Sequence, residues 1–89
     1  MNWQVYMILC SDQSIYTGIS NDVLRRYQQH ASQRGAKYFR GRSPQQLVYV
    51  EHSADRSSAS KREIAIKKLN RSQKIALITS ENNVIAAFA

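Results

Sequence analysis

The segment Trp3–Ser20, which reads WQVYMILC-SDQS-IYTGIS, decides the fold of this chain. Residues Trp3–Cys10 alternate between the two sides of a strand and are rich in strand-forming side chains. Ser11–Ser14 is typical of a turn, and Ile15–Ser20 has the composition of a second strand. We therefore predict two antiparallel strands joined as a β-hairpin.

Strand side chains alternate, so each predicted strand has an even-numbered and an odd-numbered face. Cross-strand partners share a face, and even residues should therefore pair with even residues, for instance Cys10 opposite Tyr16. The odd faces carry the apolar sets of the main core, Val5, Met7 and Leu9 with Ile15 and Ile19. The even faces then bring Tyr6 and Tyr16 out together, beside the small residue Gly18.

The hairpin is followed by a helix, a loop and a third strand. Asn21 or Asp22 is the expected cap of a helix that runs to about Gln33. Its buried face should carry residues at helical spacing, namely Leu24, Tyr27 and Ala31. Gly35–Arg42 reads as a basic loop that ends at Ser43–Pro44, and Gln46–His52 reads as a strand.

Two further helices complete the pattern. Ser57 or Ser58 is the expected cap of the first, which runs to about Leu69, and Ser72 is the expected cap of the second, which runs to about Thr79. We predict an α/β fold of the α+β type, with a small three-stranded antiparallel sheet flanked by helices in the order ββαβαα. Residues 1–81 form the predicted domain, and residues 82–89 form a short C-terminal tail.

The length of 89 residues favours a single domain with one small core. Cys10 is the one cysteine, which excludes an intramolecular disulfide and a cysteine-based zinc site. The longest apolar run, Val5–Cys10, is far shorter than the roughly 20 residues that span a bilayer. The first residues lack the basic region and cleavage site that are typical of a signal peptide. We therefore expect a soluble cytoplasmic protein with no membrane partner.

The charge is strongly basic, with 13 Lys and Arg against six Asp and Glu and a formal net charge of +7. Between Asp22 and Glu51 there is no acidic residue, whereas six basic ones occur there: Arg25, Arg26, Arg34, Lys37, Arg40 and Arg42. A polyanion such as nucleic acid is the natural partner of such a region. Small intracellular proteins are often basic, however, so the charge alone leaves this open.

Few side chains offer catalytic chemistry. Arg26 and His30 are four residues apart and share one face of the first helix. Glu63 shares a helix face with the apolar residues Ala59 and Ile66, which turns it toward the fold. Simpler interpretations stay open: a salt bridge from Glu63 to Lys67, a solvated basic face at Arg26, and ordinary strand tyrosines.

Five segments together resemble the GIY-YIG nuclease family, and the likeness covers about residues 4–78. Gln4–Tyr6 and Tyr16–Gly18 resemble the two tripeptides that name the family. Asp22–His30 resembles its first helix, and the residues from Lys37 to Tyr49 resemble its small stand-alone members. Ala59–Leu69 resembles its second helix. Gln4 and Thr17 depart from the tripeptides, and Ile19 and Ser20 stand where some members carry a lysine.

The resemblance implies a metal-dependent endonuclease that hydrolyses phosphodiester bonds with weak sequence preference, DNA being favoured over RNA and DNA repair a general setting. Glu63 would hold one Mg²⁺ or Mn²⁺, and no small-molecule cofactor is expected. Arg26 would contact the phosphoryl oxygens, and Tyr6 or Tyr16 would position or deprotonate the attacking water. His30 would orient a tyrosine or phosphate, or relay a proton.

Positive charge predicts a set of residues that bind nucleic acid: Arg25, Arg34, Lys37, Arg40, Arg42 and Lys67. We predict that the catalytic candidates converge on one concave basic surface, with Gly18 leaving room for a phosphate: Tyr6, Tyr16, Arg26, His30 and Glu63. A non-catalytic nucleic-acid-binding module on the same fold is the alternative. An adaptor that binds a protein partner through Val84–Ala89 is a third interpretation.

Overall fold

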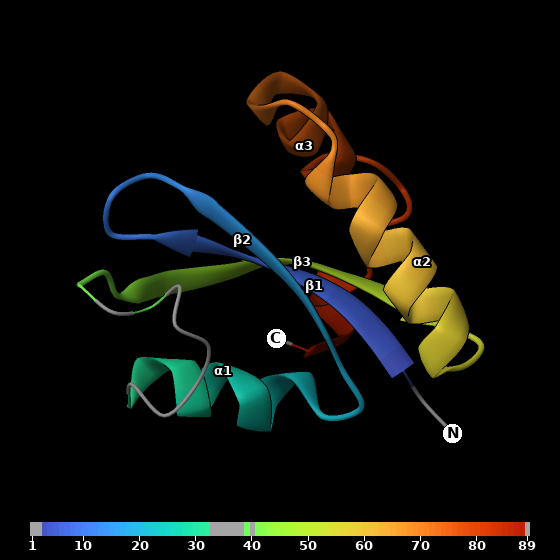
Figure 1. Cartoon of the computed structure of the whole chain (residues 1–89), viewed down its shortest axis with the longest axis horizontal. Helices are drawn as coiled ribbons and strands as arrows, with labels where there is room; N and C mark the ends of the chain where they lie inside the picture. The colour runs from blue at the N-terminus through green and yellow to red at the C-terminus, as the bar shows by residue number, and fades with distance from the viewer. Residues whose placement is uncertain (1–2, 33–38, 40, 89) are drawn as a thin grey trace.

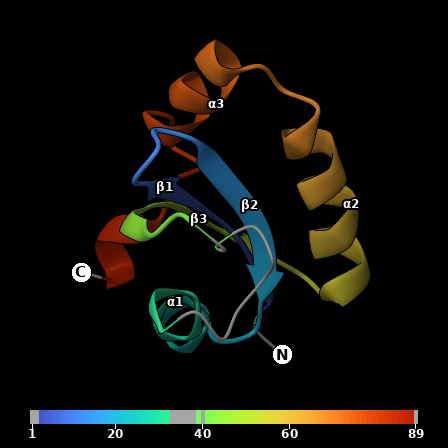
Figure 2. The same ribbon diagram turned by 60° about the vertical axis from the view of Figure 1, so that its left-hand side comes forward.

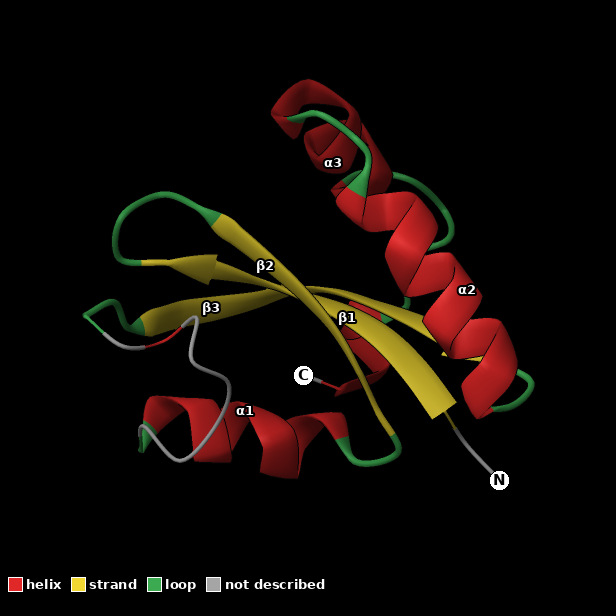
Figure 3. Cartoon of the chain, viewed as in Figure 1, coloured by secondary structure: helices red, strands yellow, loops and turns green. Residues whose placement is uncertain are grey.

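A computed structural model describes residues 3–32, 39 and 41–88 of the chain. It confirms the predicted order of elements, which a short 3₁₀ helix, η2, extends. The elements are β1 (Trp3–Cys10), β2 (Ile15–Ser20), α1 (Val23–Ala31), β3 (Pro44–Ser53), α2 (Arg56–Lys67), α3 (Arg71–Ile78) and η2 (Ile85–Phe88). Figure 3 shows how helices and strands alternate along the chain.

The molecule has three layers, with the sheet in the middle. The strands lie in the order β2-β1-β3 and both pairs are antiparallel, so β1 is central and the other two strands are edges. Helix α1 covers one face of the sheet, and α2 and α3 cover the other (Figures 1 and 2). Side chains from α1 and side chains from α2 can therefore meet only around the rim of the sheet.

The hairpin confirms the predicted pairing of even with even residues, but the example of Cys10 opposite Tyr16 is wrong. Tyr16 pairs with Ile8, and Tyr6 pairs with Gly18. The register moves by two residues because the turn is tight: the Cys10 amide donates to the Ser14 carbonyl at 2.9 Å. Gln13 closes this turn with a φ of 70°, a left-handed conformation that few non-glycine residues adopt.

Both faces of the sheet are buried, each against its own helices. The odd-numbered face packs on α2 and α3 through four of the five predicted residues, Val5, Met7, Ile15 and Ile19, whereas the half-buried Leu9 is not a member of this cluster. The even-numbered face forms a second core cluster, which the sequence analysis did not expect to be so closed. Its buried members are Tyr6, Ile8, Cys10, Val23, Phe39 and Val50.

The buried face of α1 lies one position away from the predicted one. Val23 and His30 are its buried residues, whereas Leu24 is 50% exposed and Ala31 is also exposed. Tyr27 is half-buried and packs against the even-numbered cluster. His30 occupies the buried side because its hydrogen bond to Tyr6 offsets the free energy that the imidazole loses on leaving water.

The caps and ends of the elements differ slightly from the predictions. Asp22 caps α1 as expected, but Asp55 and Asn70, not a serine, cap α2 and α3. The Asp55 carboxylate accepts the Ser58 amide at 2.7 Å, and Asn70 forms a reciprocal capping box with Gln73. Helix α1 ends at Ala31, α2 at Lys67 and α3 at Ile78, so each ends one or two residues before the predicted position, and α2 and α3 also begin before their predicted caps. Strand β3 is longer than predicted at both ends.

Asn83 ties the C-terminal residues to the sheet. Its amide nitrogen donates to the carbonyls of Val48 at 2.9 Å and Ile78 at 2.8 Å. Its side-chain oxygen accepts the amides of Val50 at 3.2 Å and Ile85 at 3.0 Å. The Val84 amide then donates to the Val50 carbonyl, and Val84 and Ile85 pack against the even-numbered cluster. The predicted domain boundary after residue 81 therefore falls between residues that contact each other in the structure.

Candidate active site

A buried tyrosine–histidine pair lies between β1 and α1. A hydrogen bond of 2.9 Å joins the Tyr6 hydroxyl to Nε2 of His30. Tyr6 is 1% exposed and His30 is fully buried. His30 Nδ1 makes no hydrogen bond within the described part of the chain. The two residues predicted as partners are thus held together inside the even-numbered cluster.

Gly18 makes room for this pair. It lies directly across from Tyr6 in the hairpin. A Cβ atom at residue 18 would lie 2.6 Å from the Tyr6 hydroxyl oxygen, 2.8 Å from Tyr6 Cζ and 3.0 Å from Cε2 of Tyr16. The space that we reserved for a phosphate beside Gly18 is therefore filled by the two tyrosine rings, and that part of the prediction is wrong.

Phe39 is a buried residue of the site that the sequence analysis missed. Its ring centroid lies 4.4 Å from that of His30 and 5.0 Å from that of Tyr16. Tyr16 itself lies 5.2 Å from His30 and 6.2 Å from Tyr6, so four rings form one aromatic cluster. An apolar residue in the middle of a basic loop is the signal that could have identified Phe39.

Arg26 provides the positive charge beside this aromatic cluster. One turn before His30 on α1, it is partly buried, and its Nη1 donates to Oε1 of Gln29 at 2.9 Å. It also lines a hollow at the start of α1 together with Ser20, Asn21, Asp22, Arg25 and Gln29. The guanidinium therefore reaches both the tyrosines and a surface that solvent can enter.

Burial and Arg26 together set the protonation of the cluster. Burial raises the pKa of Tyr6 well above its usual range, whereas the charge of Arg26 acts to lower it. Burial likewise raises the pKa of Tyr16, and Arg26 again opposes this. Burial, helped by Arg26, lowers the pKa of His30 to about 4. At neutral pH both phenols keep their protons and the imidazole is neutral.

Glu63 approaches Tyr16 from the other side of the sheet. The buried residues Ala59 and Ile66 fix the face of α2 that packs on the strands, and Glu63 lies between them in the sequence. The Glu63 side chain is 22% exposed, and Oε1 lies 3.6 Å from Nζ of Lys67. Its charge raises the pKa of Tyr16, so the two side chains are within electrostatic reach. The simpler interpretation, an ion pair with Lys67, is therefore present, but it leaves Glu63 accessible.

A partly buried ion pair and its tyrosine partner hold α2 in place next to Glu63. Arg62 donates from Nε to Oε2 of Glu51 at 2.9 Å and from Nη2 to Oε1 at 3.1 Å. The hydroxyl of the buried Tyr49 donates to the same Oε1 at 2.5 Å. This network joins α2 to β3 and fixes the helix along the sheet. The sequence analysis did not identify it, although Arg62 is adjacent to Glu63.

The Glu63 carboxylate is a suitable ligand for a hard cation that is held weakly. No group of three or more His, Cys, Asp and Glu side chains gathers among the residues that the structure describes. Mg²⁺, however, keeps several waters and is commonly bound through one or two carboxylates plus substrate phosphates. An accessible carboxylate on the rim of the sheet meets that requirement. Glu63 is the residue that would hold such an ion.

The residues predicted to grip nucleic acid are only partly brought together. Arg25 is exposed on α1, close to Arg26, and Lys67 is exposed on α2. Arg42 lies at the far end of the hairpin, where its Nε is 3.2 Å from a carboxylate oxygen of Asp12. Arg34, Lys37 and Arg40 lie outside the described residues.

Comparison with known proteins identifies the class. Residues 2–76 match the model of the GIY-YIG catalytic domain, and the chain therefore belongs to the GIY-YIG family. It is 44% identical over 86 residues to the UPF0213 protein DP2720 of Desulfotalea psychrophila, covering 96% of this chain and 78% of that protein. It is 46% identical to the UPF0213 protein CPE1444 of Clostridium perfringens over 82 residues, which cover 92% and 87% of the two chains.

A solved structure agrees with the fold. The NMR structure of the UPF0213 protein BH0048 from Bacillus halodurans is 38% identical and superposes with a TM-score of 0.59, covering 100% of this chain and 95% of that one. The GIY-YIG family consists of endonucleases that act on nucleic acid and generally use a divalent metal, so membership suggests a nuclease. None of the helices in the described residues has the length and apolar content needed to cross a bilayer.

Proposed function

We propose that the chain is a metal-dependent endonuclease that hydrolyses phosphodiester bonds of DNA with weak sequence preference. The observation that carries this proposal is the position of Tyr16. Its phenol is within electrostatic reach of Arg26, on α1, and of Glu63, on α2. These helices cover opposite faces of the sheet (Figures 1 and 2). A purely structural tyrosine needs neither a cation nor an anion beside it.

Phosphodiester hydrolysis places negative charge on the phosphoryl oxygens. The proposed residues would stabilise that charge or position the attacking water. Arg26 would donate to the non-bridging oxygens from the rim of the aromatic cluster. Glu63 would hold the divalent metal, which would supply neutralisation of the developing charge. Tyr16, half-buried beside both groups, would contact the attacking water. Because burial raises its pKa, Tyr16 would keep its proton at neutral pH and would orient this water through a hydrogen bond.

Tyr6 and His30 act behind Tyr16 in this proposal. Tyr6 is too deeply buried to contact a polymer, and its 2.9 Å bond to His30 fixes both rings. The neutral imidazole of His30 can accept a hydrogen bond from the Tyr6 hydroxyl, whereas transfer of the proton itself is opposed by the raised pKa of Tyr6 and the lowered pKa of His30. We assign Tyr16 as the tyrosine that contacts water, and Tyr6 and His30 as the pair that positions it.

A cleavage assay with matched variants tests the proposal. Purified protein is incubated with plasmid, single-stranded DNA, branched DNA and RNA, with Mg²⁺ or Mn²⁺ and with excess chelator. Glu63→Gln should abolish cleavage while leaving folding and binding of DNA largely intact. Glu81→Gln makes the same chemical change at an exposed carboxylate and should have no effect. Undiminished cleavage in chelator, or full activity of Glu63→Gln, would show that the proposal is wrong.

The non-catalytic binding module remains the second candidate, and one observation favours it. Glu63 already has a partner in Lys67, as a structural residue would. This alternative predicts that DNA binds in a salt-dependent way and is never cut under any of the metal conditions above. The same assay, with binding measured alongside cleavage, separates the two candidates.

A further inference from the structure

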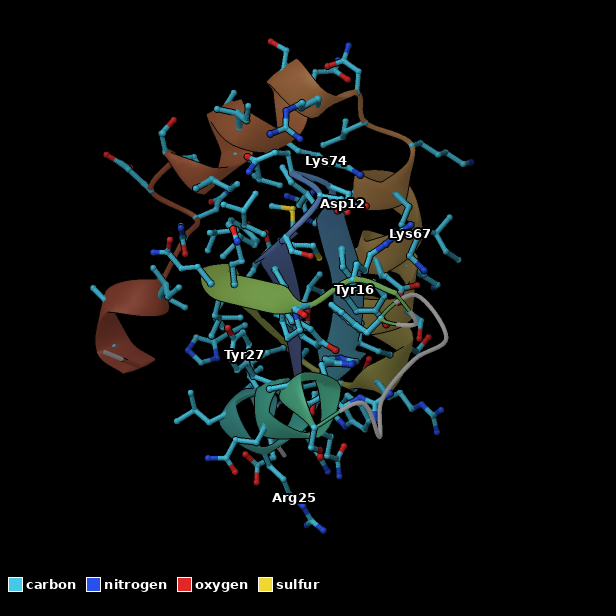
Figure 4. All side chains as sticks on the ribbon, turned by 90° about the vertical axis from the view of Figure 1, so that its left-hand side faces the viewer. Asp12, Tyr16, Arg25, Tyr27, Lys67 and Lys74 are labelled. Atoms are coloured by element: carbon cyan, nitrogen blue, oxygen red, sulfur yellow. The ribbon has the colours of Figure 1, made fainter. Side chains whose placement is uncertain are left out.

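A basic groove begins at Tyr16 and lies between β2 and the residues at the end of α2 and the start of α3. It has a volume of about 390 Å³ and is lined by Ile15, Tyr16, Thr17, Lys67 and Lys74. We call it the Lys67–Lys74 groove. Figure 4 shows Tyr16, Lys67 and Lys74 on the same side of the molecule. Strand β2 is a sheet edge, so no further strand fills this space.

The position of Lys74 is fixed by the start of α3. Asn70 and Gln73 form the reciprocal capping box that begins the helix. Arg71 then donates from Nη1 to the carbonyl of Gln13, which joins α3 to the β1–β2 turn. The Lys74 amide bonds to the Asn70 carbonyl at 3.0 Å, one turn into the helix. The capping box thus fixes the start of the helix that carries Lys74, and the Arg71 contact joins that helix to the hairpin.

The groove offers unsatisfied donors. Lys74 forms no ion pair with any residue that the structure describes. Lys67 has only the Glu63 carboxylate at 3.6 Å, a loose contact from which its exposed side chain can turn. The Thr17 hydroxyl is buried, and within the described residues it makes no hydrogen bond. Buried polar groups normally have partners, so this one indicates that a ligand or its water belongs here.

We propose that the Lys67–Lys74 groove binds one unpaired nucleotide next to the cleaved bond, with its phosphate between the two ammonium groups. This inference rests on the proposed nuclease function, because Tyr16 marks where the groove meets the scissile phosphate. The volume falls at the low end of the roughly 300–1,000 Å³ of small-ligand sites, which suits one nucleotide and not a duplex. Ile15 and the Tyr16 ring provide an apolar surface for the base.

Binding measured in chelator tests the groove without any cleavage. Fluorescence anisotropy compares a blunt DNA duplex with the same duplex carrying a single-stranded overhang, over a range of salt concentrations. Lys74→Gln should weaken overhang binding up to about fivefold and lower the salt slope by about 0.7, as for one lost single-strand phosphate contact. Lys74→Arg should retain most of the affinity. Lys68→Gln removes the same charge at an exposed position outside the groove and is the matched control.

The outcomes are distinct. Loss of the overhang preference in Lys74→Gln, with Lys68→Gln like wild type, supports the groove even if the protein never cuts DNA. Equal effects of the two glutamine variants, or equal loss on blunt and overhang DNA, would overturn it even if cleavage is observed. Thermal unfolding of Lys74→Gln checks that the variant is folded. If it is not, Lys67→Gln, at the other side of the groove, should lose the overhang preference in the same way.

Discussion

Gly18→Ala should destabilise the protein, because the added methyl group has no space. Its Cβ would come 2.6 Å from the Tyr6 hydroxyl and 2.8 Å from Tyr6 Cζ. The Tyr6 ring cannot swing away, since it is 1% exposed and bonded to His30 at 2.9 Å. Forcing an extra methyl into a packed core costs about 1–3 kcal/mol. Replacing a strand glycine by alanine returns about 0.5–1 kcal/mol.

Contacts of 2.6 and 2.8 Å put the steric cost in the upper part of its range, about 2–3 kcal/mol, so the expected net loss is about 1–2.5 kcal/mol, or a fall in Tm of roughly 4–20 °C for a domain of this size. Urea and thermal unfolding followed by circular dichroism measure it. A double-mutant cycle with Tyr6→Phe, which removes the hydroxyl nearest the new methyl, should show a favourable coupling of about 0.5 kcal/mol or more. A Tm of Gly18→Ala within about 2 °C of wild type, or strict additivity with Tyr6→Phe, would refute the packing described at this glycine.

Three further predictions concern the proposed site. Arg26→Ala should lower turnover by about 10²-fold or more with little change in affinity for DNA. Arg25→Ala, on the same helix, should chiefly weaken DNA binding and reduce its salt dependence. Equal effects of the two variants on turnover and on affinity would contradict this division of roles. Burial lowers the pKa of folded His30 to about 4 from its usual value of about 6.5, so the free energy of unfolding should fall as pH drops from about 6.5 to 4, with a slope that corresponds to the uptake of up to one proton. His30→Gln should remove that slope in urea titrations, and an unchanged slope would count against it. Excess chelator should stop cleavage in wild type without lowering its Tm, since Glu63 alone holds the proposed ion.

The sequence predicted what depends on local patterns. Alternation placed Tyr6 and Tyr16 on one face, because a strand has only two faces and one-residue slips are costly. It could not predict the register itself, since that depends on Gln13 adopting a left-handed conformation that its side chain does not favour. Helix periodicity likewise identified α1, but a hydrogen bond from Tyr6 to His30 decided which side faces the sheet.

The candidate site was only partly predictable for a related reason. The spacing of Arg26 and His30 is local, and the structure does bring both residues to the tyrosines. The burial of Phe39 against these rings depends on how a loop folds back, which no local pattern encodes. The ion pair between Arg62 and Glu51 joins residues 11 positions apart on two different elements. Such contacts follow from the packing of the whole domain.

The side chain of Asn83 has a consequence for how this protein behaves in a crowded solution. Strand β3 is an edge, and an open edge is a template on which a strand of another chain can pair. Asn83 and Val84 occupy the outward-facing groups of Val48 and Val50, as one short pseudo-strand would. Asn83→Ala would release the Val50 amide and the Val48 carbonyl and expose that part of the edge. The variant should then self-associate at high concentration, and so the C-terminal residues protect the chain from aggregation along β3.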